Sequence, residues 1–409
     1  MSETIVLGGG MVGVGTALAL QERGHEVVLV DRREPGEETS YGNAGIIQTE
    51  AAEPVPMPRS LSRLFGIALG RTNDVIWNPA SLPSFLKPLA SYFWYSAPSR
   101  YRRQSLVYSQ LTRRAFDDHE PLIESSGAGH LIREGGFRDA FRSPHRLDEE
   151  VRRAEHITAT YGVRHLALDG PALAQAEPNL RIGMAGAVQW PDSRTCLSPG
   201  GLTKAYAELF QSRGGTIVKG DGMTLQRRGS GWSVQGQEGV IEARNAVMAL
   251  GPWSQALASR LGYAVPMLRK RGYHWHLKPI AGPNTSILDA ERGAFMAVMQ
   301  AGIRIATGAE LTDFAAPANP RQINKAIAAA HELFELGDPV EAQPWFGTRP
   351  CMPDMLPLVG KAPRHDGLWF NFGHGHQGFT LGPTTGILLA DMMVGGPTPD
   401  YASRLGFRW

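Results

Sequence analysis

Apolar and polar positions over the first 31 residues follow a strand, a turn, a helix and a second strand. Thr4 to Leu7 ("TIVL") is a short apolar run, and "GVGTALALQERG" has helical spacing that ends in a glycine at Gly24. The next apolar run, "HEVVLV", ends at Asp31. The uncharged stretch from Ile5 to Leu20 is shorter than the ~18 apolar residues of a membrane span. The pattern therefore predicts a βαβ unit.

The turn of this unit carries the motif G-x-G-x-x-G at Gly8, Gly10 and Gly13. Gly8 allows the tight turn, Gly10 allows a pyrophosphate to approach the helix N-terminus, and Gly13 allows helix and strand to pack closely. Asp31 follows Gly13 by 18 residues, at the distance from which an acid binds the ribose hydroxyls of an adenosine. The arrangement predicts a dinucleotide site, for either FAD or NAD.

Composition narrows the class of protein. A chain of 409 residues exceeds one ordinary core and predicts two domains. Its formal charge of +2 gives no case for nucleic-acid binding. Only Cys196 and Cys351 are present, and "MSETIVLGGG" lacks a basic start, so we expect no disulfide framework and no signal peptide. These features favour the cytoplasm.

Seven blocks of sequence resemble the D-amino-acid oxidase superfamily of FAD-dependent oxidoreductases, and most of all the bacterial D-amino-acid dehydrogenases. They are "IVLGGGMVGVGTA", "ETSYGNAG", "ARNAVMALGPWSQAL", "KRGYHWHL", "GIRIATGAEL", "GTRPCMPDMLPLVG" and "NFGHGHQGFTLGPTTGILLADMM". The resemblance covers nearly the whole chain. It implies FAD as the cofactor and an α/β (α+β overall) fold, in which a Rossmann-like FAD-binding domain joins a substrate domain with a mainly antiparallel sheet.

The resemblance also implies which residues surround FAD. Met11, Val12 and Arg32 lie beside the glycine motif and Asp31, and Met223 would contact the adenine through its backbone. Gly375, Gly378, Phe379 and Thr380 belong to a loop and helix start whose positive dipole end would stabilise the reduced flavin. The remaining positions implied by the resemblance are Thr39, Ser40, Asn43, Ala44, Gly45, Gly251 and Trp253.

Arg349, a lone cation in "WFGTRPCMPDMLPLVG", falls where the family binds the substrate's α-carboxylate. A planar guanidinium matches a carboxylate with two parallel hydrogen bonds. The alternative is a structural ion pair, for instance with Asp354. Tyr273 would assist the same carboxylate or belong to the core, and His376 would form a wall of the active site where glycine oxidases carry a second arginine.

Two further features bear on cofactors. The H-x-H pairs at His274/His276 and His374/His376 have no carboxylate at metal-ligand spacing, so we predict no metal site. Monomeric sarcosine oxidases attach FAD covalently through a cysteine near the Arg349 block, but the matching position here is Gly347, not Cys351. The resemblance therefore implies non-covalent FAD.

The implied reaction is oxidative deamination of a D-amino acid, with hydride transfer from Cα to flavin N5 and hydrolysis of the imine to a 2-oxo acid and ammonia. An oxidase or dehydrogenase of secondary amines, such as proline derivatives or N-methyl amino acids, is the alternative. A third possibility is an FAD-bearing protein with a structural or binding role, whose flavin no amino acid would reduce.

The positions of the blocks predict a discontinuous FAD-binding domain of residues 1–50, 194–262 and 345–409. Residues 51–193 and 263–344 would form the substrate-binding domain.

A basic and aromatic segment lies in the first part of that second domain. Between Arg59 and Arg103 there are seven basic residues and one acid, Asp74, with six aromatic residues interleaved from Phe85 to Tyr101. This composition suits either a surface on anionic lipid or a helical pair with a core of aromatics. Because the resembling dehydrogenases pass electrons to membrane quinones, we expect a quinone or similar acceptor and peripheral contact with the inner face of the membrane. The basic residues are Arg59, Arg63, Arg71, Lys87, Arg100, Arg102 and Arg103.

Overall fold

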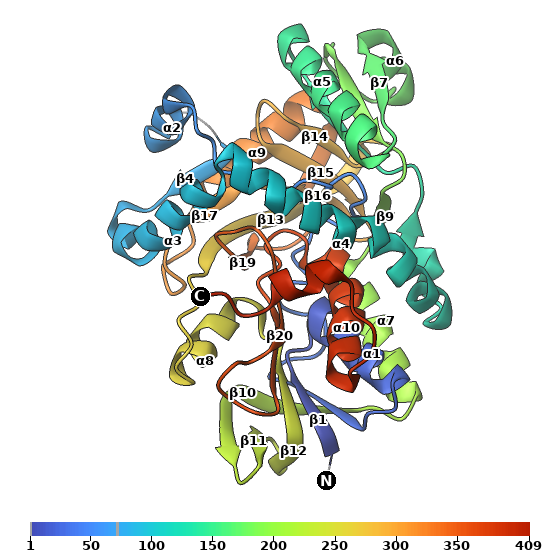
Figure 1. The fold of residues 1–409 in the computed structure, drawn as a ribbon. Coiled ribbons are helices and arrows are strands. Elements are labelled where there is room, and N and C mark those ends of the chain that lie inside the picture. The colour runs from blue at the N-terminus through green and yellow to red at the C-terminus, as the bar shows by residue number, and fades with distance from the viewer. Residues whose placement is uncertain (1, 71–72) are drawn as a thin grey trace.

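The computed structural model describes residues 2–70 and 73–409, and its strands form two large sheets and one small one (Figure 1). The first sheet has seven strands, in which β1 pairs in parallel with both β2 and β12, and β12 pairs in parallel with β21. Its strands are β1 Ser2–Leu7, β2 Val27–Asp31, β10 Thr216–Arg228, β11 Gly231–Gly236, β12 Gly239–Met248, β20 Leu358–Lys361 and β21 Leu368–Phe372.

The second sheet has eleven strands, and most of its pairs are antiparallel. Its centre is β13, which pairs with β16, β17, β18 and β19. The strands are β4 Val75–Trp77, β6 Phe137–Phe141, β7 Leu166–Asp169, β8 Gly186–Trp190, β13 Leu268–Ala281, β14 Ile287–Asp289, β15 Ala294–Met299, β16 Gly302–Ala306, β17 Ala309–Leu311, β18 Glu335–Pro339 and β19 Trp345–Cys351. The small sheet joins β3 Ile46–Ile47, β9 Arg194–Cys196 and β5 Ile132–Arg133.

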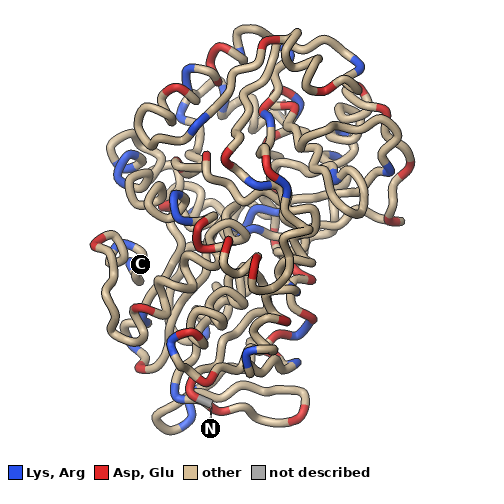
Figure 2. Tube along the Cα trace, turned by 90° about the vertical axis from the view of Figure 1, so that its right-hand side faces the viewer, with Lys and Arg blue, Asp and Glu red and all other residues tan. Residues whose placement is uncertain are grey.

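Helices cover both large sheets. The α-helices are α1 Met11–Glu22, α2 Leu61–Ala68, α3 Leu82–Tyr95, α4 Pro98–Ser125, α5 Pro144–Tyr161, α6 Gly170–Ala176, α7 Pro199–Ser212, α8 Ser254–Arg260, α9 Arg321–Leu333 and α10 Gly378–Val394. Short 3-10 helices span Pro79–Ser81, Ala128–Leu131, Gly251–Trp253 and Asp400–Leu405. Lys and Arg residues are interspersed with Asp and Glu along the whole trace (Figure 2).

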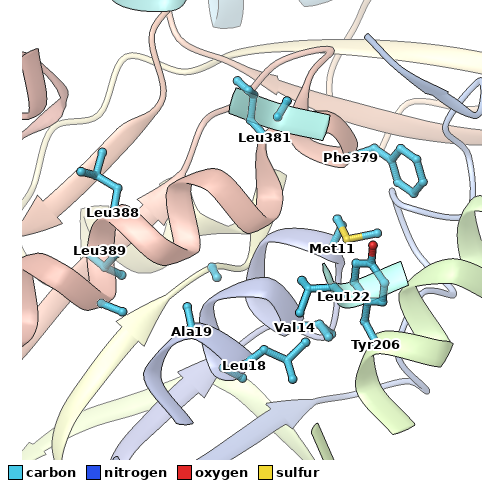
Figure 3. Packing of buried hydrophobic residues seen from close by; sticks show 14 of the residues in the cluster. Met11, Val14, Leu18, Ala19, Leu122, Tyr206, Phe379, Leu381, Leu388 and Leu389 are labelled. Atoms are coloured by element: carbon cyan, nitrogen blue, oxygen red, sulfur yellow. The ribbon is translucent and has the colours of Figure 1, made fainter. Parts of the chain in front are cut away.

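The largest core cluster lies where α1 packs against α7 and α10 (Figure 3). Met11, Val14 and Leu18 of α1 share this cluster with Leu381, Leu388 and Leu389 of α10. The two helices approach closely at Gly15 and Gly386, since a Cβ on Gly386 would lie 2.7 Å from the Gly15 carbonyl carbon. This contact holds the first helix and the last one together, so their N-termini border one site.

The predicted βαβ unit is present as β1, α1 and β2. The four residues Val27–Val30 of β2 are all buried, as expected for a strand covered on both faces of a parallel sheet. The predicted mixed α/β fold with a second, mainly antiparallel sheet is confirmed. The division into domains stays a prediction, although β19, expected in the FAD-binding part, pairs with β13 of the second sheet.

Candidate active site

One cavity, which we call the cofactor cavity, is bordered by segments that follow the carboxyl ends of four parallel strands. Gly8 follows β1, Asp31 ends β2, Ala249 follows β12 and Gly373 follows β21. Ligands of α/β sheets bind at this edge. The residues expected at FAD that line it are Gly8, Gly10, Met11, Val12, Asp31, Arg32, Thr39, Ser40, Asn43, Ala44, Met223, Gly251, Trp253, Gly375, Gly378 and Phe379.

Three residues expected at FAD do not line this cavity. A Cβ on Gly13 would lie 1.7 Å from the Gly8 carbonyl oxygen, so Gly13 serves the close packing of helix and strand. Gly45, with φ +74°, packs against the Cys196 carbonyl. The Thr380 hydroxyl is buried and hydrogen-bonds the Ile46 carbonyl at 3.3 Å. These three residues therefore support segments next to the cavity without lining it.

The N-terminus of α1 fits the pyrophosphate of a dinucleotide. The helix has no side-chain cap at Gly10 and no acid in its first turn, and Ser40 Oγ accepts the Met11 N–H at 2.9 Å. A negative charge is favoured at such an end because unpaired N–H groups and the helix dipole face it. Asp31 is fixed by the N–H groups of Gly9 and Arg33, at 2.5 and 3.0 Å. Arg32 lies over the Trp253 ring, 4.2 Å from its centroid.

A buried polar chain holds the loop that carries Asn43. Arg304 donates from Nη1 to the Tyr41 and Asn43 carbonyls and from Nε to His276 Nε2 at 3.0 Å. Because Nε2 accepts, Nδ1 of His276 carries the proton and donates to Glu341. Burial lowers the pKa of His276, and Arg304 lowers it further, while Glu341 opposes the shift. These contacts give His276 a positioning role.

Arg349 lines the cofactor cavity from β19. It donates from Nη1 to the Gly308 carbonyl at 2.8 Å and from Nη2 to the Thr307 carbonyl at 3.3 Å. Among the residues that the structure describes, no carboxylate pairs with Arg349. Asp354, the suggested ion-pair partner, binds Arg408 instead, with Nη2 to Oδ1 at 3.0 Å. Burial lowers the pKa of Arg349, as expected for a cation that lacks a fixed anion.

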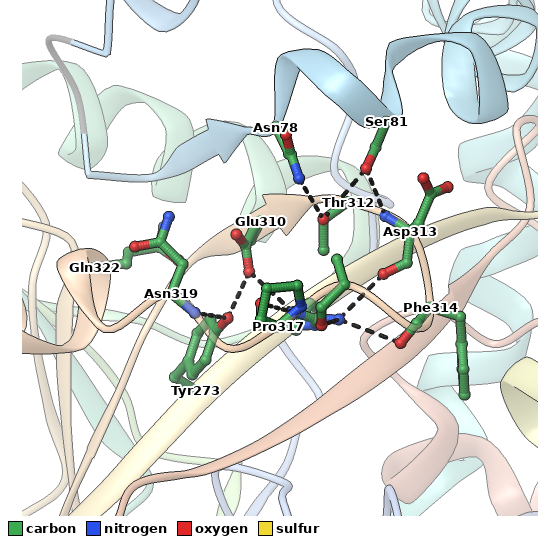
Figure 4. Close-up of polar contacts among 12 residues, drawn as sticks. Asn78, Ser81, Tyr273, Glu310, Thr312, Asp313, Phe314, Pro317, Asn319 and Gln322 are labelled. Carbon is green, nitrogen blue, oxygen red and sulfur yellow. Dashed lines mark hydrogen bonds and ion pairs between the residues drawn. The ribbon is translucent and has the colours of Figure 1, made fainter.

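Of the two expectations for Tyr273, the structure favours a place in the core, since the side chain is buried. Although Tyr273 is among the lining residues, its hydroxyl donates to Glu310 Oε2 at 2.5 Å and accepts the Asn319 N–H at 2.9 Å (Figure 4). Side chains alternate along a strand, so Tyr273 and Arg349, whose register partner is Lys270, point to opposite faces of the sheet. The Tyr273 hydroxyl therefore supports the sheet and points away from Arg349.

A second cavity, of about 390 Å³, adjoins the first one; we call it the substrate cavity. Arg349, His376 and the Gly42–Ala44 and Gly373–Gly375 segments line both cavities. His376 is open to them, and burial lowers its pKa, with Arg349 and then Lys270 adding to the effect. His374 instead bonds the Thr385 hydroxyl at 2.9 Å. Glu50, Asp139 and Lys270 also line the substrate cavity, and sequence analysis missed all three.

Histidine and carboxylate side chains do not gather into a metal centre. Across residues 2–70 and 73–409, no group of three or more His, Cys, Asp or Glu residues could hold an ion.

The family model for "FAD dependent oxidoreductase" matches residues 3–392. The chain belongs to this family. FAD is therefore its cofactor, and the N-terminus of α1, Asp31 and the open cavity fit that group. The resemblance seen in the sequence blocks is confirmed.

Curated relatives extend over the same length. A D-amino-acid oxidase of Bradyrhizobium diazoefficiens is 29% identical over 95% of this chain and 94% of its own. A D-amino acid dehydrogenase of Cereibacter sphaeroides is 30% identical over 98% of this chain and 93% of its own. These names are consistent with an amino-acid oxidoreductase.

Solved structures agree on the fold. Glycine oxidase from Geobacillus kaustophilus aligns with a TM-score of 0.76 at 20% identity, covering 100% of this chain and 98% of its own. L-proline dehydrogenase from P. horikoshii gives 0.71 at 17% identity, covering 100% and 99%. At these identities the likeness concerns the fold alone.

Proposed function

We propose that this FAD-dependent amino-acid oxidoreductase is a D-amino-acid dehydrogenase, which converts a D-amino acid to a 2-oxo acid and ammonia through an imine. The observation that carries the proposal is Arg349, a cation without a carboxylate partner among the described residues, at the junction of the cofactor and substrate cavities. The curated relatives named for D-amino acids support this stereochemistry.

In this proposal Arg349 holds the substrate carboxylate with two parallel hydrogen bonds, and so fixes the orientation of Cα. FAD, when bound, supplies the hydride acceptor. His376 stays neutral at pH 7, because its pKa is lowered by burial and the two neighbouring cations, so it adds no charge at the carboxylate. The N-terminus of α10, at Gly378, offers its dipole to negative charge in the cofactor cavity.

FAD is held without a covalent bond in this proposal. Glycine stands at position 347, where a linking cysteine would be needed, and burial raises the pKa of the Cys351 thiol. A raised pKa keeps the thiol protonated and weakens it as a nucleophile. We further propose that residues 1–50, 194–262 and 345–409 form the FAD-binding domain. Its strand β19, which carries Arg349, pairs with β13 of the second sheet.

An anaerobic screen tests the proposal. The FAD-loaded protein is mixed with D- and L-amino acids, proline derivatives and N-methyl amino acids, and the flavin absorbance is followed. We expect bleaching by primary D-amino acids and little by their L-enantiomers. Faster bleaching by secondary amines would favour the alternative amine oxidase, and no bleaching by any of them would indicate a binding role.

We also propose that α2, α3 and the start of α4 contact an anionic membrane, where a quinone accepts the electrons. Leu61, Phe65 and Leu69 are 72%, 65% and 64% exposed, and Trp94 is 59% exposed. Exposed basic residues surround them, namely Arg59, Arg63, Lys87, Arg102 and Arg103, with Arg100 half-buried under the Trp94 ring. Apolar side chains ringed by cations suit a surface on anionic lipid.

Two of the residues expected at this surface are placed differently. Phe85 and Tyr92 are buried, so leucines supply much of the exposed apolar surface. Arg71 lies outside the described residues. No helix in the part of the chain that the structure describes has the length and apolar character to cross a bilayer. The proposed contact is therefore peripheral.

Charge reversal tests the membrane contact. Replacing Arg100, Arg102 and Arg103 by Glu is expected to abolish binding to phosphatidylserine vesicles at low salt, since each basic residue contributes about 1 kcal/mol. Dye-coupled activity should be kept. A control variant with Arg133, Arg152 and Arg404 replaced by Glu has the same net charge and should still bind. Rapid hydrogen peroxide production in air, with no vesicle binding by the unmodified protein, would identify a soluble oxidase instead.

A further inference from the structure

Lys270 is a second cation beside Arg349. The two residues are register partners in the β13–β19 pair, so their side chains point to the same face of the sheet. Both line the substrate cavity, and Lys270 Nζ lies 4.4 Å from the centroid of the Tyr92 ring. Neither residue forms an ion pair with a carboxylate within residues 2–70 and 73–409.

The charge of Lys270 persists despite its burial. Burial and Arg349 act to lower the pKa of Lys270, whereas the hydrogen bond with the Tyr92 hydroxyl acts in the opposite direction, and the pKa is raised overall. Two adjacent cations with reduced access to water are costly unless an anion lies between them. The face that carries Lys270 and Arg349 is therefore built for a negatively charged group.

Two carboxyl groups also line this cavity. Glu50 and Asp139 are 6% and 9% exposed. Asp139 Oδ2 accepts the Trp190 indole N–H at 2.9 Å, and its other oxygen accepts no hydrogen bond from the described residues. Arg153 lines the same cavity and acts to lower the pKa of both carboxyl groups, but its guanidinium is paired with Glu150 at 2.5 Å. Both Glu50 oxygens accept hydrogen bonds, from the Gln48 amide and the Ser193 hydroxyl, so the oxygen of these two carboxyl groups left without a partner among the described residues is on Asp139.

Burial raises the pKa of Asp139 to about 7, and burial also raises the pKa of Glu50. A carboxyl group of this kind pays a desolvation cost when it ionises alone, and an arriving cation removes that cost. An apolar side chain would leave the free oxygen of Asp139 unpaired, and an acidic one would be repelled.

We propose that the substrate is an amino acid with a basic side chain, held with its carboxylate between Lys270 and Arg349 and its side-chain cation against Asp139 and Glu50. Lys270 is then a second carboxylate-binding residue, and Asp139 is the residue that determines side-chain specificity. The proposal rests on the proposed amino-acid oxidation at this site, and it names the class of amino acid.

Three D-amino acids of similar length separate the possibilities: ornithine with a cationic end, norleucine with an apolar end and glutamate with an anionic end. Their binding to the FAD-loaded protein is measured anaerobically from the change in flavin absorption, together with the rate of bleaching. We expect ornithine to bind at least about tenfold more tightly than norleucine, since a hydrogen bond to a charged group is gained, and glutamate to bind most weakly.

Asp139→Asn is expected to remove the advantage of ornithine and to leave norleucine unchanged, while Asp148→Asn, at an exposed site on α5, should change neither. Glu50→Gln should reduce the same advantage. Lys270→Met should weaken all three ligands, and acetate as a side-chain-free carboxylate, by a similar factor of about tenfold. Lys270→Arg should restore part of the affinity, and Lys278→Met, exposed on the same strand, should have no effect.

Equal binding of ornithine and norleucine, or an equal loss for all three ligands in Asp139→Asn, would overturn the assignment of the acidic end. Unchanged acetate affinity in Lys270→Met would overturn that of Lys270. Because binding is read without turnover, these results differ from a failure of the proposed function, in which ligands bind but no amino acid bleaches the flavin.

Discussion

Arg349→Ala and Arg349→Lys are expected to keep FAD but to lose amino-acid turnover by about 100-fold or more. Alanine removes the only side chain in β19 that offers two parallel donors to the substrate cavity. Lysine keeps the charge but is a point donor, so it cannot fix both carboxylate oxygens and the Cα–H direction together. The effect is measured as the rate of flavin bleaching under anaerobic conditions, with FAD content determined for each variant.

A structural role for Arg349 predicts a different outcome. Its guanidinium donates to two carbonyls of the segment after β16, and a purely structural role would make folding the only property that alanine impairs. In that case the yield of folded protein would fall while the activity per bound FAD stayed normal, and the carboxylate assignment would be wrong. Arg364→Lys, at an exposed arginine, serves as the matched control and should leave both quantities unchanged.

Local patterns were enough to predict the first βαβ unit and the cavity at its edge. The glycine spacing and the buried run of β2 are set by residues close in sequence, and Asp31 lies at the cavity as expected. The place of β19 was harder to predict. Its pairing with β13 joins Lys270 to Arg349 across a long stretch of chain, and such a register depends on packing that periodicity does not reveal.

The same limit explains the residues that were missed. Lys270 stands in the charged run "LRKRGYHWHLK", which gives no sign that one lysine is turned into a cavity. Gly272 faces the Arg349 side chain, and residues two apart in a strand lie on the same face of the sheet. Once the pairing of β13 with β19 is known, Lys270 is therefore placed on the face of Arg349. Arg304 and Glu341 likewise reach His276 only through strand pairing and loop packing.

Asp31→Ala is expected to weaken FAD binding roughly 10- to 100-fold, since a charged hydrogen bond is worth about 1.5–3 kcal/mol. Asp31 ends β2 at the cofactor cavity, where its oxygens are fixed by the Gly9 and Arg33 N–H groups. A carboxylate held in this way accepts hydrogen bonds from ribose hydroxyls without further loss of side-chain entropy.

FAD affinity is measured by equilibrium dialysis, and Asp31→Asn should lose less affinity than Asp31→Ala because one acceptor oxygen remains. Glu34→Ala, in the same loop but paired with Lys219 at 3.0 Å, should bind FAD normally. Unchanged FAD affinity in Asp31→Ala would remove Asp31 from the cofactor site and leave the N-terminus of α1 as the main determinant of binding.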